Sequence, residues 1–161
     1  MTVLVAHASK RGGTQGLAES IGEALREAGD DVRVVPARAV SDLAGVDAVV
    51  VAGALYSRHW HKDARRFVKH HAAVLSGIPV WLVASGPLDE SADDGRLPPV
   101  DQVAQAAARI GARGSETFGG RLEPDATGFP ASAMAKTKAG DWRNPDQVRR
   151  FAQQVHEVLA G

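Results

Sequence analysis

The chain has 161 residues, 44% of them hydrophobic, and its 19 lysines and arginines balance 19 aspartates and glutamates. This length and composition predict one globular domain over residues 1–161, and the neutral balance provides no global field toward nucleic acid or an anionic membrane. Cysteine is absent, which excludes disulfides, thiolate nucleophiles and cysteine-ligated zinc or iron–sulfur clusters.

Membrane and export signals are missing from the sequence. No segment approaches the roughly 20 apolar residues that span a bilayer. The first apolar run is short and lacks the basic leader and cleavage site of a signal peptide. We therefore expect a cytoplasmic protein that does not cross a membrane, with contact to a membrane surface left open.

Strand and helix patterns alternate along the chain. Apolar runs predict strands over 2–7, 32–35, 46–52 and 79–84, with a short fifth strand at 117–118. Apolar residues at helical spacing predict helices over 17–28, 64–75, 103–110 and 144–159, the last with Asn144 as cap and Pro145 in its first position. The alternation predicts an α/β fold with five parallel strands and helices on both faces. Such sheets bind ligands at the carboxyl ends of their strands.

The first expected strand leads into a loop of small, hydroxylated and basic residues, followed by an amphipathic helix. Backbone N–H groups of such a loop and the positive end of the helix dipole converge on one point, where they favour a phosphate. Neither the Walker pattern nor the dinucleotide pattern is present. The loop suits a single terminal phosphate, such as that of FMN. A glycine-rich turn without a ligand is the alternative interpretation.

Two further loops leave the expected carboxyl ends. Residues 53–61 contain Tyr56, Trp60, His59 and His61, and aromatic side chains there could stack on a flat ring or only cover the end of the sheet. Residues 85–88 could direct N–H groups toward the edge of such a ring. The two histidines lack a supporting third ligand nearby in the sequence, so we expect no metal site. Either imidazole could donate a proton beside a flavin; no catalytic residue is assigned.

Segments 3–14, 56–62, 67–71, 118–122 and 140–143 resemble the flavodoxin-like superfamily, and within it the branch of menaquinone-dependent protoporphyrinogen oxidases. The resemblance implies a three-layer, flavodoxin-like sandwich that binds FMN. It implies that the phosphate is held by Ser9, Lys10, Arg11, Gly12, Gly13 and Thr14. It implies that the ring is lined by Ala54, Leu55, Tyr56, Ser57, Arg58, Trp60, Ser85, Gly86, Pro87 and Leu88.

The function implied is an FMN-dependent oxidoreductase that oxidises a protoporphyrinogen-type substrate and passes electrons to a quinone. One departure is the connection 123–136, which is poor in large apolar residues where that branch has an apolar insert. A non-enzymatic electron carrier serving other redox proteins is the first alternative, and the neutral net charge counts against it. A cofactor-free binding module is the second, and the intact loop 9–14 counts against that.

Overall fold

The computed structural model describes residues 1–9, 13–86, 97–122, 140–141 and 144–161. Its strands are β1 (Thr2–Ala8), β2 (Asp31–Pro36), β3 (Ala48–Tyr56), β4 (His59–Trp60), β5 (Val80–Ser85), β6 (Gly114–Phe118), β7 (Arg121–Leu122) and β8 (Gly140–Asp141). Its helices are α1 (Gly13–Glu27), α2 (Lys62–His70), α3 (Ala72–Leu75), α4 (Asp101–Ile110) and α6 (Pro145–Ala160), with a 3-10 turn η1 (Ala37–Ala39).

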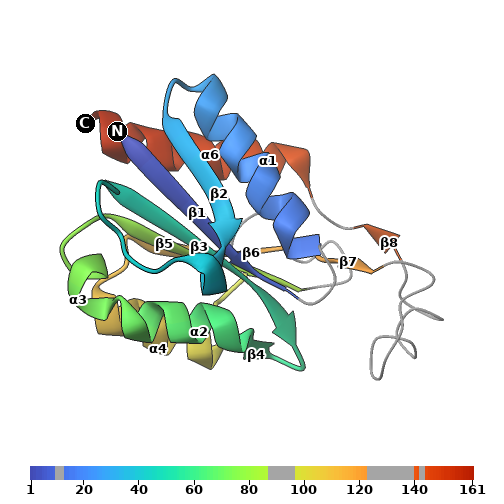
Figure 1. Ribbon diagram of the computed structural model, residues 1–161. Coiled ribbons are helices and arrows are strands. Elements are labelled where there is room, and N and C mark those ends of the chain that lie inside the picture. The colour runs from blue at the N-terminus through green and yellow to red at the C-terminus, as the bar shows by residue number, and fades with distance from the viewer. Residues whose placement is uncertain (10–12, 87–96, 123–139, 142–143) are drawn as a thin grey trace.

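Five parallel strands form the central sheet in the order β2-β1-β3-β5-β6. Helices α1 and α6 cover one face, and α2, α3 and α4 cover the other (Figure 1). The expected three-layer α/β flavodoxin fold is confirmed. Two additions were not predicted: β4 pairs antiparallel with the end of β3, and β7 pairs with β8 as a separate two-stranded sheet.

The core has two halves because alternate residues of each buried strand face opposite sides of the sheet. In β1, Leu4 and Ala6 pack toward α2 and α4, whereas Val3 and Val5 pack toward α1 and α6. All four side chains are fully buried. Continuous apolar runs in β1 and β3 are therefore explained by burial on both faces, as parallel sheets require.

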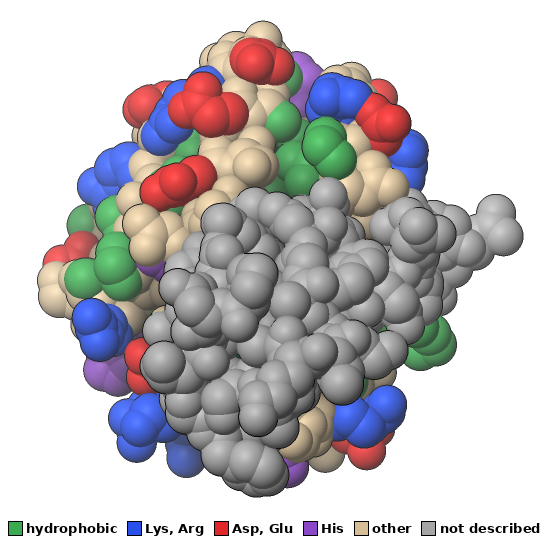
Figure 2. Space-filling model, turned by 90° about the vertical axis from the view of Figure 1, so that its right-hand side faces the viewer, with side chains coloured by type: hydrophobic (Ala, Val, Ile, Leu, Met, Phe, Trp, Pro, Cys, Tyr) green, Lys and Arg blue, Asp and Glu red, His purple; other side chains and the backbone are tan. Residues whose placement is uncertain are grey.

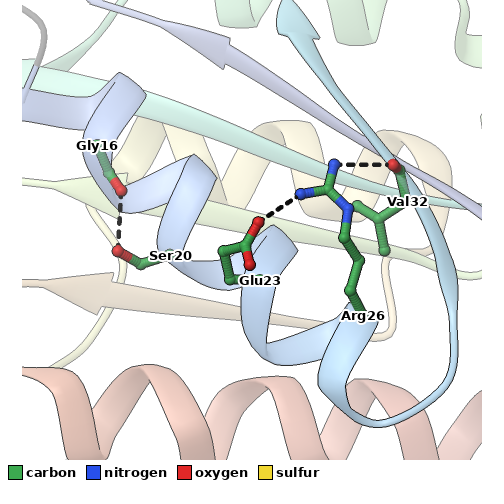
Figure 3. Close-up of polar contacts among 5 residues, drawn as sticks. All are labelled: Gly16, Ser20, Glu23, Arg26 and Val32. Atoms are coloured by element: carbon green, nitrogen blue, oxygen red, sulfur yellow. Dashed lines mark hydrogen bonds and ion pairs between the residues drawn. The ribbon is translucent and has the colours of Figure 1, made fainter.

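Helix α1 is fixed to the neighbouring strand by close packing and by one arginine. A Cβ on Gly22 would lie 2.7 Å from Val34 Cγ2, so glycine lets the helix approach β2 closely. The Arg26 guanidinium donates to the Val32 carbonyl at 3.0 Å and to Glu23 Oε1 at 2.7 Å (Figure 3). These contacts hold the second half of α1 against β2.

Element boundaries differ from the expected ones in two places that matter for the site. Strand β3 runs to Tyr56, four residues beyond the expected end, so the segment expected to be a loop continues the sheet. The single helix expected over 64–75 is divided at His71, which ends α2 with φ −101° and ψ 15°. Among the residues that the structure describes, no helix is both long enough and apolar enough to cross a membrane.

Candidate functional site

The strand register brings three of the expected site segments to one edge of the sheet. Ala8 at the end of β1 lies beside Gly53 of β3, and Ala54 lies beside Ser85 at the end of β5. Ser85 in turn pairs with Phe118 of β6. The segments that follow these strands therefore start from adjacent positions, as expected for a ligand-binding edge of an α/β sheet.

The first segment connects β1 to helix α1. Ser9 is half-buried, α1 begins at Gly13, and Thr14 in the first turn is buried. Lys10, Arg11 and Gly12 lie outside the described residues. The first turn of α1 contains no acidic residue, whereas α2, α4 and α6 each carry one, namely Asp63, Asp101 and Asp146. The positive end of the α1 dipole is therefore not neutralised by a carboxylate of its own first turn, which suits an external anion.

The second segment is a tight hairpin between β3 and β4. Ser57 and Arg58 form its turn with φ of 49° and 66°, the left-handed pair of a two-residue hairpin turn. Neither residue is glycine, so the turn stores backbone strain of order 1 kcal/mol per residue. Tyr56 lies opposite His59 in the register and is partly exposed at the tip. The hairpin holds Tyr56, Ser57 and Arg58 together at the carboxyl end of β3.

Trp60 corrects one expectation. Its side chain is fully buried, and its indole Nε1–H donates to the Val83 carbonyl at 3.2 Å. The ring occupies the space that a side chain on Gly53 would need, because a Cβ there would lie 2.4 Å from Trp60 Nε1. Trp60 thus anchors the hairpin in the core and is not positioned to shield a flavin.

The third segment starts at Ser85 and Gly86. Ser85 is buried, and the Gly86 N–H donates to the Phe118 carbonyl at 3.1 Å. A Cβ on Gly86 would lie 2.8 Å from Leu55, and one on Gly120 would lie 3.3 Å from the Gly86 carbonyl oxygen. Leu55 is half-buried against this glycine, while Ala54 is buried in the strand. Glycine at 86 and 120 lets three chain segments approach each other; Pro87 and Leu88 lie outside the described residues.

The two histidines on either side of Trp60 have different roles, His59 in β4 and His61 at the start of α2. His61 is buried and caps α2, because its Nδ1 accepts from the Asp63 N–H at 3.0 Å. His59 is exposed and contacts Gln102 of α4 at 3.2 Å. Among the described residues, no group of three or more histidines and carboxylates could hold a metal ion.

Sequence reasoning did not identify His7, which is buried near the end of β1. Burial lowers the pKa of His7, and the charge of Glu19 opposes this shift. A neutral imidazole is therefore favoured next to the segment that connects β1 to α1. Its signal was a lone histidine ending an apolar run, which is also common in structural cores.

A groove of about 460 Å³ is lined by residues of α1 and of the first turns of α6, where the two helices pack together. Glu19, Glu23 and Glu27 line its α1 side at one-turn spacing, with Arg149 of α6 among the other lining residues. Figure 2 looks onto the side of the molecule where β4, β7 and β8 lie, and side chains of both charge signs surround the part that is not described. Although the net charge of the chain is zero, α1 carries a local row of three carboxylates, Glu19, Glu23 and Glu27.

The comparisons with known proteins agree with this arrangement. The family described as Flavodoxin domain matches residues 4–137, while none of the curated proteins compared with the chain matches it. A flavodoxin from Streptococcus pneumoniae TIGR4 is 22% identical, with a TM-score of 0.62 and 99% of each chain covered. The two-electron reduced flavodoxin of Megasphaera elsdenii is 20% identical, with a TM-score of 0.61 and coverage of 94% of this chain and 98% of that one.

A third similar structure is an enzyme. The rubredoxin oxygen:oxidoreductase of Desulfovibrio gigas is 12% identical with a TM-score of 0.67, and the match covers 99% of this chain but 36% of that one. At these identities the solved structures establish the fold alone. They offer no support for the protoporphyrinogen oxidase branch, and the connection 123–136 that bears on it lies outside the described residues. What the match over residues 4–137 does establish is the family: the chain is a member of the flavodoxin domain family.

Proposed function

We propose that this protein binds FMN at the carboxyl edge of its sheet and carries electrons between redox partners. The observation that carries the proposal is the placement of a small, hydroxylated loop between β1 and an α1 first turn without a carboxylate, in a chain that matches the flavodoxin domain. Electron carriage is favoured over a specific enzymatic activity because the full-length structural matches are flavodoxins.

The phosphate would be held by the first segment. Backbone N–H groups at the start of α1 provide donors that no helical carbonyl uses. Hydroxyls of Ser9 and Thr14 would add donors, and the basic pair Lys10 and Arg11 in the loop would offset the phosphate charge. Burial of Thr14 matters here, because a hydrogen bond shielded from water is electrostatically stronger.

The ring would lie against the second and third segments. Tyr56, Ser57 and Arg58 are held at the hairpin tip, and Leu55 with Gly86 forms a closely packed base beside it. Bound FMN would supply reversible electron transfer, which no side chain of this chain can provide. The role of the protein is to fix the ring at the surface edge of the sheet, where a partner can approach it.

The row Glu19, Glu23 and Glu27 supports a protein partner. It begins five residues after Thr14, on the exposed side of the helix that would hold the phosphate. A local carboxylate row can steer a partner with a basic surface even when the whole chain is neutral. Two of these carboxylates have local partners, Gln15 and Arg26, so the field is moderated rather than removed.

The test is the visible absorption spectrum of the purified full chain before and after addition of FMN and desalting. Retained flavin bands with altered shape are expected, and riboflavin, which lacks the phosphate, should be lost on desalting. A protein that retains neither compound would overturn the proposal. Retention of both equally would remove the phosphate assignment.

A second assay separates carriage from catalysis. The FMN-loaded protein should accept electrons from a flavoprotein reductase and pass them to a haem protein. It should not turn over with a quinone and protoporphyrinogen as acceptor and donor. Multiple turnovers with that pair would instead support the oxidase function that the sequence resemblance implied.

A further inference from the structure

One glutamine of α4 holds both residues of β4. Gln102 Oε1 accepts the Trp60 backbone N–H at 2.8 Å, and Gln102 Nε2 lies 3.2 Å from His59 Nδ1. The Trp60 carbonyl is held in turn by Arg65 Nε of α2 at 3.0 Å, and the His61 N–H donates to the Ala54 carbonyl of β3. The outward edge of this two-residue strand is thus held by side chains from two helices.

The donor and acceptor roles in these contacts determine which ring nitrogen of His59 must accept a hydrogen bond. A backbone N–H can only donate, so the atom facing Trp60 N must be the amide oxygen of Gln102. The other amide atom is then the NH2 group, which can only donate, and it faces His59 Nδ1. For this contact to be a hydrogen bond that ring nitrogen must accept, so the arrangement requires the hydrogen of His59 on Nε2.

If His59 were protonated, Gln102 could not form its hydrogen bonds with Trp60 and His59 at the same time. The imidazolium has N–H groups on both ring nitrogens, so its Nδ1–H would face the Gln102 NH2 group. Rotation of the amide by 180° would relieve this contact but would place NH2 against the Trp60 N–H. One of the two hydrogen bonds is lost either way.

We propose that Gln102 is a positioning residue that couples the protonation of His59 to the placement of the Tyr56–Arg58 turn, and so to cofactor binding at that turn. The predicted effect on FMN binding rests on the proposed function. The predicted effect on the hydrogen bonds of Gln102 with His59 and Trp60 does not depend on that function. The strained turn depends on its anchors, because consecutive left-handed residues persist only where surrounding contacts hold them.

Other titratable and charged groups around β4 define the setting. The hairpin contributes Tyr56 and Arg58, and α4 contributes Asp101. Helix α2 and its cap contribute His61, Lys62, Asp63 and Arg65. Of these, Arg65 is committed to the Trp60 carbonyl, and His61 accepts from the Asp63 N–H. Gln102 is the residue whose described hydrogen bond with His59 requires one particular protonation state.

The first experiment needs no ligand. Long-range ¹H–¹⁵N NMR of the histidine rings in the full chain should show His59 with its hydrogen on Nε2 at about pH 8, above the ordinary titration range of imidazole. On acidification to about pH 5, where an ordinary imidazole is charged, the protection factor of the Trp60 amide should fall, because this factor removes the slowing of intrinsic amide exchange in acid. A hydrogen on Nδ1 at high pH would overturn the proposal.

The second experiment uses a variant in which acid should strengthen, rather than weaken, the contact between position 102 and His59. In Gln102→Glu, one carboxylate oxygen can still accept from Trp60 and the other can accept from protonated His59, so acid should strengthen the contact. Gln105→Glu is the matched control, because it adds the same charge one turn along the exposed side of α4. Effects of acid on FMN itself are common to both variants and cancel in the comparison.

The expected result is a difference in the pH trend of the FMN dissociation constant. Acidification should weaken FMN binding in wild type and Gln105→Glu by about 2- to 10-fold through the hairpin, which is the range of one hydrogen bond. In Gln102→Glu this acid-induced weakening through the hairpin should be absent or reversed. Equal trends in all three proteins would overturn the coupling to the ligand. If no protein retains FMN, the proposed function fails, and the NMR result still decides whether Gln102 selects the His59 tautomer.

Discussion

Helices α1 and α6 pack side by side on one face of the sheet, yet their first turns are built differently (Figure 1). The start of α6 is closed by Asn144, whose side chain accepts from the Asp146 and Gln147 N–H groups at 3.0 and 3.2 Å. The start of α1 has no acidic residue and follows a loop of small, hydroxylated and basic residues. One helix satisfies its N-terminus with its own side chains, and we propose that the start of the other is satisfied by the phosphate of the ligand.

The N-terminus of a helix can be stabilised by a cap from the chain itself, or it can bind an anion. A side-chain cap stabilises the fold whether or not a ligand is present. A helix N-terminus without a carboxylate adds to the stability of the fold only when an anion is bound to it. Substitutions in the first turn of α6 should therefore change stability alone, and substitutions in the first turn of α1 should change ligand affinity.

Thr14→Val should give the largest effect. Valine keeps the shape of this buried side chain but removes its hydroxyl. Hydrogen bonds to charged groups contribute about 1.5–3 kcal/mol, so the FMN dissociation constant should rise about 10- to 150-fold. Flavin fluorescence quenching measures it. Ser20→Ala is the control, because the Ser20 hydroxyl of the same helix donates to the Gly16 carbonyl (Figure 3). Unchanged affinity in Thr14→Val would remove the threonine from the site.

Asn144→Ala should lower the free energy of unfolding by about 1 kcal/mol, the usual cost of losing an N-cap. Chemical denaturation of the apo and FMN-loaded forms measures this loss. The dissociation constant of FMN should not change, because the cap serves α6 alone. A large loss of FMN affinity in this variant would show that the two helix starts are not independent.

Gln15→Glu and Gln153→Glu form a matched pair. Each glutamine is exposed and donates at 3.1 Å to a glutamate four residues later, Glu19 in α1 and Glu157 in α6. Gln15→Glu alone puts a carboxylate in the first turn of α1, where it competes with phosphate for the dipole. We expect a weakening of FMN by about 0.3–1 kcal/mol, or roughly 2- to 5-fold, that shrinks at high salt. Equal titration curves for the two variants would contradict the role of the α1 dipole.

The smallest effect concerns pH and stability. Burial lowers the pKa of His7, and burial followed by the charge of His70 lowers that of His71. The unfolded chain then binds more protons than the folded one as pH falls below about 6.5, so the free energy of unfolding should fall in that window and be fully present above it. His7→Asn should flatten part of this fall in denaturation at several pH values. An unchanged slope would indicate that His7 stays accessible to protons in the fold.

Much of the fold could be predicted because the deciding forces are local or follow from the chain pattern. Apolar runs long enough to be buried on both faces predicted β1 and β5 closely, and Asn144 with Pro145 predicted the start of α6. The loop after β1 was predicted as a phosphate site from its composition, and whether it holds FMN stays a prediction. These features depend on residues that are neighbours in the sequence.

The hairpin could not be predicted, because its determinants are distant in sequence. Whether Trp60 faces a ligand or the core depends on the missing side chain of Gly53 and on the Val83 carbonyl of β5. The contact between Trp60 and Gln102 joins residues 42 positions apart. Sequence alone thus determined the alternation of strands and helices and the candidate phosphate loop. Only the tertiary structure decided which aromatic residue is buried and which glutamine holds the turn, because the packing partners of a side chain are chosen when the sheet assembles.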